Sequence, residues 1–132
     1  MFRRRRLPGA LQAAYESFLA TLEPLERGKA ALTESVPGAR LPGRPLAETL
    51  VEFEDGLRQA AARMPGWRIP ELEEAWLAAE AALVRCGAMS ERLRLEADMP
   101  EGFEALIGTI GDLMAPLEVF GQAEERFRSL RR

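Results

Sequence analysis

Apolar residues recur every three or four positions through four separate segments of the chain, and no window alternates apolar with polar residues. This is the period of an amphipathic α-helix and not that of a strand. Each segment has a proline near its start, where the missing N–H of proline would have no helical partner in any case. The pattern therefore predicts four helices, over residues 9–34, 45–63, 70–97 and 101–130.

Short connections join the predicted helices, at residues 35–44, 64–69 and 98–100. Such connections place consecutive helices antiparallel, so we expect an all-α, antiparallel up-down-up-down four-helix bundle. The length suits a single domain over residues 1–132, with residues 1–7 forming a flexible basic arm. The connection 35–44 carries two Pro-Gly pairs, so we expect it to be rigid and to cover the end of the short second helix.

The composition excludes several kinds of active site. The chain has no histidine and a single cysteine, Cys86, which removes histidine-based acid–base catalysis, Cys-His nucleophiles and multi-cysteine zinc sites. We therefore expect a protein that is not an enzyme and binds no cofactor or metal. No stretch is apolar for the roughly 20 residues of a transmembrane helix, so we expect a cytoplasmic protein. Lys29 stands beside 17 arginines, a bias that we attribute to a GC-rich, bacterial genome.

The third and fourth predicted helices carry more apolar surface than one small bundle can bury. Only Glu80 and Arg85 are charged within residues 75–89, and residues 105–121 are similarly apolar. A helix that is apolar on nearly all sides should be buried on all sides, so the excess favours protein–protein contact and most simply a homodimer. Alternatively, its alanines are only exposed helix formers. The expected outward residues of this helix 3/helix 4 surface are Ala78, Ala82, Met89, Ile107 and Met114.

Arginines gather at both ends of a chain whose net charge is −3. The predicted topology brings the two ends and the connection 64–69 together, which would form a basic pole. Such a pole could bind nucleic acid or an anionic lipid surface, or its arginines could only stabilise helix ends. The candidate anion-binding residues are Arg3, Arg4, Arg5, Arg6, Arg63, Arg68, Arg128, Arg131 and Arg132.

Glycines and prolines inside the predicted helices raise the hypothesis of a ligand pocket. Antiparallel pairing places Gly28, Gly87 and Gly111 at one level of the bundle, and Pro24 opposite Pro116. Both prolines should kink their helices, because each removes a backbone donor. A layer of small residues between kinked helices is either a pocket or a close contact.

Lys29 stands at a position where the helical period requires an apolar residue. In the pocket hypothesis, Lys29 and Asp112 are the polar groups that hold a small ligand. In the alternative, Lys29 extends its ammonium group outward to Glu52 or Asp112. Cys86 is expected to be a small buried side chain. The pocket candidates are Lys29, Cys86, Gly87, Gly111 and Asp112.

Overall fold

The computed structural model describes residues 2–96 and 99–131, with side chains from residue 9 onward within these ranges. The described residues form helices and no strand, which confirms the all-α class. The elements in chain order are α1 (Phe2–Thr33), α2 (Leu46–Arg63), η1 (Met64–Trp67), η2 (Pro70–Leu72), α3 (Glu73–Glu96), α4 (Phe103–Met114), η3 (Ala115–Glu118) and α5 (Val119–Leu130), where η marks a short 3₁₀ helix.

Three helices differ by more than one residue from their predicted bounds. The third is an α-helix only from Glu73 onward, because Pro70–Leu72 form a 3₁₀ turn. The first begins at Phe2 and not at residue 9, so most of the predicted basic arm belongs to α1 and Pro8 lies inside that helix. The fourth is interrupted at Pro116 and consists of α4, η3 and α5. Proline removes the amide donor that an uninterrupted α-helix needs, and the chain tightens there into a 3₁₀ turn. Pro24 leaves α1 continuous.

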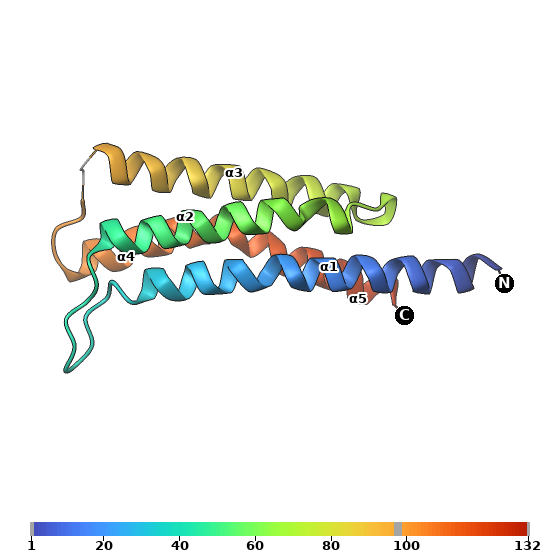
Figure 1. The fold of residues 1–132 in the computed structure, drawn as a ribbon, viewed down its shortest axis with the longest axis horizontal. Helices are drawn as coiled ribbons and strands as arrows, with labels where there is room; N and C mark the ends of the chain where they lie inside the picture. The colour runs from blue at the N-terminus through green and yellow to red at the C-terminus, as the bar shows by residue number, and fades with distance from the viewer. Residues whose placement is uncertain (1, 97–98, 132) are drawn as a thin grey trace.

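The chain reverses direction at each connection between its long helices (Figure 1). α1 packs along α2, α2 packs along α3, and α3 contacts α5 and η3. The start of α1, the end of α5 and the η1–η2 connection lie at one end of the molecule (Figure 1). The connections before α2 and before α4 lie at the other end.

An aromatic cluster fills the core at the end where the chain begins and ends. Phe18 of α1 lies 5.0 Å from Trp67 and 5.1 Å from Phe127 of α5, measured between ring centroids. Phe120 completes the cluster, 6.4 Å from both Phe18 and Trp67. Large rings fill the space between α1 and α5, so these helices meet through side chains.

The helices α1 and α2 approach each other much more closely, because two glycines face each other across their contact. A Cβ on Gly56 would lie 2.5 Å from the carbonyl oxygen of Pro24, and a Cβ on Gly28 would lie 3.3 Å from the Phe53 Cα. The prediction that Gly28 lies in one layer with Gly87 and Gly111 is therefore wrong. Gly28 meets Gly56, whereas a Cβ on Gly111 would have no neighbour within 4 Å.

The connection before α2 projects from the body of the molecule (Figure 1), and does not cover the end of α2 as predicted. At its base the Arg44 N–H donates to the Glu34 carbonyl at 2.9 Å, and near its tip the Gly38 N–H donates to the Leu41 carbonyl at 2.9 Å. The Leu41 side chain is 74% exposed. The connection presents an exposed leucine on a hydrogen-bonded loop.

Candidate interaction surface

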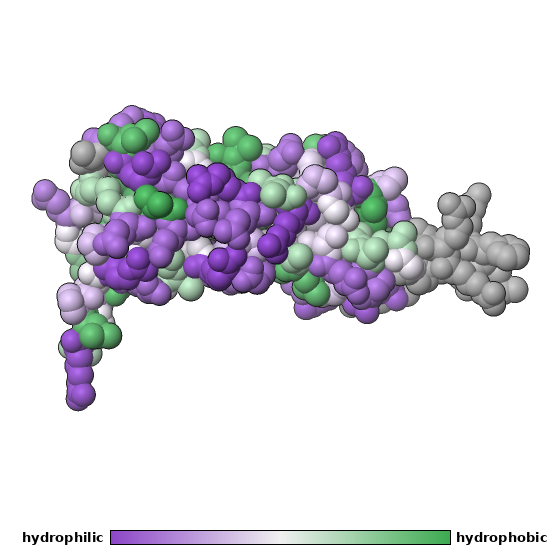
Figure 2. All heavy atoms as spheres, in the orientation of Figure 1, coloured by the Kyte–Doolittle hydropathy of each residue, from purple (hydrophilic) through white to green (hydrophobic). Residues whose placement is uncertain are grey.

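The outward side of α3 carries a line of exposed apolar side chains. Its members follow one another at intervals of four, three, four and seven residues, which keeps them on one side of a helix. Leu77 is 47%, Val84 68% and Leu95 65% exposed. Figure 2 shows hydrophobic atoms as separate spots along the edge where α3 lies, in a face that is mostly hydrophilic. This α3 stripe consists of Leu77, Ala81, Val84, Ala88 and Leu95.

A groove of about 430 Å³ runs between α2 and α3, beside the α3 stripe. Val84 and Ala88 belong both to the stripe and to the lining of this α2–α3 groove. Apolar side chains make up most of the lining, and charged side chains contribute the rest. The apolar lining is Leu57, Ala61, Leu83, Val84 and Ala88, together with Gly87; the charged lining is Glu54, Arg58 and Glu91.

Gly87 lines this groove, and the packing of the surrounding residues does not require a glycine at this position. A Cβ at Gly87 would meet only the Leu57 Cδ1, at 4.0 Å, which is an ordinary contact. Glycine inside a helix costs about 0.5–1 kcal/mol relative to alanine. The fold would therefore tolerate a larger residue at position 87, and the main effect of the glycine is to leave the groove open.

Most charges at the α2–α3 groove are compensated. Glu54 accepts two hydrogen bonds from Arg94, both at 3.0 Å, and a third from the Ser90 hydroxyl at 2.9 Å. The hydrogen bond to Glu54 raises the pKa of Arg94. Arg58 donates to Asp55. Glu91 makes no hydrogen bond or ion pair with the side chains that the structure describes, but its negative charge also raises the pKa of Arg94, so Glu54 and Glu91 both act on this arginine.

The five predicted interface residues do not form one surface. Ala78 is exposed on α3, but Ala82 is only 5% exposed, so its predicted outward position is wrong. Met89 is half-buried and lines a second groove, of about 290 Å³, between α3 and α4. Ile107 is exposed and Met114 half-buried on α4.

The α4 candidates point away from α3. On α4 the second groove is lined by Thr109, Asp112 and Leu113, which marks the side that faces α3. At about 100° per residue, Ile107 lies on nearly the opposite side of the helix from Thr109 and Asp112. The predicted helix 3/helix 4 surface is therefore divided, and the exposed apolar side chains of α3 lie on one side of that helix, interrupted by Glu91 and Arg92 between Ala88 and Leu95.

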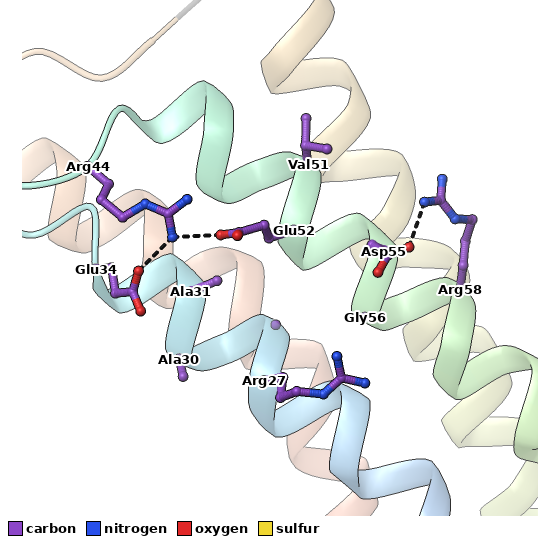
Figure 3. A pocket seen from close by; sticks show the side chains of 11 residues that line it. Arg27, Ala30, Ala31, Glu34, Arg44, Val51, Glu52, Asp55, Gly56 and Arg58 are labelled. Atoms are coloured by element: carbon purple, nitrogen blue, oxygen red, sulfur yellow. Dashed lines mark hydrogen bonds and ion pairs between the residues drawn. The ribbon is translucent and has the colours of Figure 1, made fainter.

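Another groove, of about 620 Å³, lies between α1 and α2, and its lining includes Gly28 and Gly56; Figure 3 shows its side chains. Arg44 lies between Glu34 and Glu52, with nitrogen–oxygen distances of 2.6 and 2.7 Å. The hydrogen bond to Glu52, and next the one to Glu34, raises the pKa of the Arg44 guanidinium. The other two arginines of the lining are also paired, Arg58 with Asp55 and Arg27 with Glu23. The groove is therefore lined by paired charges, and the two pairs of Arg44 hold the base of the loop before α2.

The predicted pocket residues are not brought together. Lys29 is half-buried on α1, and its Nζ lies 3.3 Å from Glu26 on the same helix. Gly87 lines the α2–α3 groove, Asp112 lines the α3–α4 groove, and Gly111 is exposed. The structure therefore separates the members of the predicted Lys29 pocket.

Cys86 is fully buried on α3, as expected, and its thiol donates a hydrogen bond to the Leu113 carbonyl of α4 at 3.1 Å. Burial raises the pKa of this thiol to about 11. The cysteine is therefore a protonated core side chain that joins two helices at neutral pH.

The described arginines of the predicted basic pole are held by other groups. Arg68 pairs with Glu73 at 2.7 Å and lies 4.2 Å above the Trp76 ring. Arg128 contacts two glutamates one turn back on α5, and Arg131 lies above the Tyr15 ring. Arg63 donates to a backbone carbonyl of α1. The side chains of the remaining candidates, Arg3, Arg4, Arg5, Arg6 and Arg132, lie outside the described residues.

Two further features are absent from the described part of the chain. No group of three or more His, Cys, Asp or Glu side chains there could hold a metal ion. No described helix is long and apolar enough to span a membrane.

Sequence reasoning missed Leu41 and the three large side chains of the stripe, Leu77, Val84 and Leu95. The signal for the stripe is present in the sequence, because Leu77, Val84 and Leu95 follow a helical spacing of their own beside the core positions of α3. The exposure of Leu41 has no such signal, since one leucine between two prolines does not show whether a loop folds back or projects.

Comparison with models of protein families, with curated proteins and with solved structures finds no match to this chain.

Proposed function

We propose that this protein is a non-enzymatic, antiparallel up-down-up-down four-helix bundle that acts through protein–protein contact, by binding a second copy of itself through α3. One observation carries the proposal: the α3 stripe exposes three large apolar side chains in line along the helix. It keeps α3 as the contacting helix, but none of the α3 residues expected from the sequence, Ala78, Ala82 and Met89, belongs to the stripe. The α4 part drops out because its residues lie on another side.

The energetics of burial favour such a contact. Burying a fully exposed leucine or valine is worth about 1.5–3 kcal/mol, and side chains that are 47% to 68% exposed, as Leu77, Val84 and Leu95 are, would gain a corresponding part of it. In a two-fold symmetric dimer the same patch is used twice, so each apolar side chain of the stripe contributes from both copies. The alanines at positions 81 and 88 leave room between the larger side chains for those of a facing surface.

The test is the mass in solution, measured by light scattering over a range of concentrations. We expect a mass of two chains for the unaltered protein and of one chain for Val84→Glu. Leu19→Glu, which changes an exposed leucine on α1, is the matched control and should leave the mass of two chains. Circular dichroism of each variant checks that the helices persist. A mass of one chain for the unaltered protein at every concentration would overturn the proposal.

A further inference from the structure

We infer that two copies of the chain pack α3 against α3 in parallel, with the same charged residues pairing twice across the contact. Glu80 pairs with the partner's Arg85, and Glu91 pairs with the partner's Arg92. This inference rests on the proposed self-association and adds the orientation of the second copy. Charge complementarity supports it, because the charges beside the α3 stripe differ in sign from one side of the stripe to the other.

Glutamates stand on one side of the stripe and arginines on the other. At about 100° per residue, Glu80 and Glu91 lie on the side that faces α2, where Glu91 lines the α2–α3 groove. Arg85 and Arg92 lie on the opposite side, and all four residues are exposed. The one further charged residue along the stripe, Arg94, is hydrogen-bonded to a glutamate of α2. Each side of the stripe therefore has one sign of charge to offer.

A parallel pair brings opposite charges together. In a two-fold parallel pair, each side of one stripe faces the opposite side of the other stripe, and every residue lies at the level of its own copy. Glu80 is then about 7.5 Å from the level of the partner's Arg85, and a long helical side chain such as arginine leans toward the start of its helix, which reduces that separation. Glu91 and the partner's Arg92 differ in level by one residue. Pairs of this kind set the orientation of helices that pack along a common stripe.

An antiparallel pair brings like charges together. In that arrangement each side of one stripe faces the same side of the other stripe. When Leu77 meets the partner's Leu95, Arg85 lies beside the partner's Arg85. In the same register, Glu80 lies at the level of the partner's Glu91. Like charges that face each other in a contact oppose association, so the charges select the parallel pair.

The charged side chains are available for this contact. Glu80, Arg85 and Glu91 make no hydrogen bond or ion pair with the side chains that the structure describes. Arg92 lies 3.2 Å from Glu96, but both side chains are more than half exposed, and an exposed pair one turn apart on a helix is only weakly stabilising. The loop before α2 projects on the side of the molecule away from α3 (Figure 1), so it does not obstruct the contact.

Gly87 leaves space for the partner's arginine beside Glu91. It lies five residues before Arg92 and on the α2 side of the stripe, which receives that arginine in the parallel pair. A Cβ at position 87 would meet only the Leu57 Cδ1, at 4.0 Å, so the packing within one chain does not require the glycine. A large side chain there would stand in the path of the partner's Arg92.

Disulfide formation between single cysteines tests the orientation. In the parallel pair the two residues at position 95 meet, so Leu95→Cys should form a covalent dimer on oxidation, seen on a non-reducing gel. In the antiparallel pair these positions are about 27 Å apart along the helix axis, too far for a disulfide, and only a mixture of Leu77→Cys with Leu95→Cys would link. The controls are the unaltered protein, whose Cys86 is fully buried, and Leu19→Cys, which is exposed on α1. Both should remain single chains on the gel.

An exchange of charges tests the ion pairs. Arg85→Glu and Glu80→Arg should each raise the dissociation constant about tenfold, measured by sedimentation equilibrium, and the double variant should restore it. Arg85→Glu combined with Glu16→Arg has the same net charge as that double variant, but Glu16 lies on α1, so association should stay weak. In an antiparallel pair, Glu80→Arg would instead strengthen association, because it places an arginine beside the partner's Glu91.

The outcomes separate this inference from the proposed function. A mass of one chain for the unaltered protein at every concentration overturns both. A disulfide that forms only in the mixture of the Leu77 and Leu95 variants leaves self-association standing and shows that the parallel orientation is wrong. The absence of any disulfide while association persists has the same meaning. A covalent dimer of Leu95→Cys, together with restored association in the Glu80–Arg85 exchange, supports the parallel pair.

Discussion

Arg63 of α2 donates a hydrogen bond to the Ala20 carbonyl of α1, with a nitrogen–oxygen distance of 2.9 Å. Ala20 lies four residues before Pro24, so its carbonyl is the one that the missing N–H of Pro24 leaves without a helical donor. The guanidinium thus supplies from a neighbouring helix the hydrogen bond that proline removes. Cys86 has a corresponding role at Pro116. Its thiol donates a hydrogen bond to the Leu113 carbonyl, which lies three residues before Pro116, at the spacing of a 3₁₀ hydrogen bond.

Arg63→Ala should therefore destabilise the protein by about 1 kcal/mol, the typical net value of a hydrogen bond. The same change in a Pro24→Ala background should cost much less, because alanine at position 24 restores the N–H that Ala20 needs. Urea unfolding of the four proteins of this double-mutant cycle measures the coupling. Equal losses in both backgrounds would show that Arg63 does not substitute for the missing amide.

These hydrogen bonds also show what the sequence could and could not predict. The apolar period and the position of prolines located the four helical segments, because both depend on local geometry. Pro24 and Pro116 were predicted to kink their helices. Pro116 interrupts the fourth helix whereas Pro24 leaves α1 continuous, and the side-chain donors near the two prolines come from other helices and have no local signal. The levels assigned to the glycines failed because the pairing considered the first helix with the fourth and the third with the fourth, whereas the close contact of Gly28 is with α2. Gly28 and Gly56 bring α1 and α2 together, while Phe18, Phe120 and Phe127 fill the space between α1 and α5.

The candidate surface was harder to predict than the fold. The apolar excess of α3 is visible in the sequence, yet Ala82 was assigned outward although its neighbour Leu83 lies at the edge of the core. An error of one position rotates a side chain by about 100° around the helix. That is enough to exchange a buried residue for an exposed one, so the list of outward residues depended on helix orientation, which only the packing sets.

Gly56→Ala should destabilise the protein although alanine is the better helix former. The added Cβ would lie 2.5 Å from the Pro24 carbonyl oxygen, so α1 and α2 must separate, at a cost of about 1–3 kcal/mol. Gly111→Ala is the matched control, because a Cβ there meets nothing within 4 Å. It should stabilise the protein by about 0.5–1 kcal/mol. Urea unfolding distinguishes the two, and a stabilising Gly56→Ala would contradict the close contact.

The carboxylate of Glu73 should titrate at a lower pH in this protein than in Arg68→Ala. The hydrogen bond from Arg68 holds the pKa of Glu73 below its ordinary value. A carboxyl group whose pKa is lowered by folding stabilises the folded state above its unfolded pKa, and this contribution is lost as the pH falls through the folded pKa. NMR titration of the Glu73 side chain in both proteins measures the shift. Identical titration curves would show that the pair does not persist in solution.

Cys86 should react with a thiol reagent only when the protein unfolds. Its side chain is fully buried, and burial raises the pKa of the thiol to about 11, so the reactive thiolate is scarce at neutral pH. Because folding raises this pKa, the thiol stabilises the folded state fully below its unfolded pKa, and the contribution is lost as the pH rises through about 11. The labelling rate at neutral pH should therefore rise with urea in proportion to the unfolded fraction. Rapid labelling without denaturant, at a rate that urea does not change, would show that α3 and α4 separate at Leu113 while the protein remains folded.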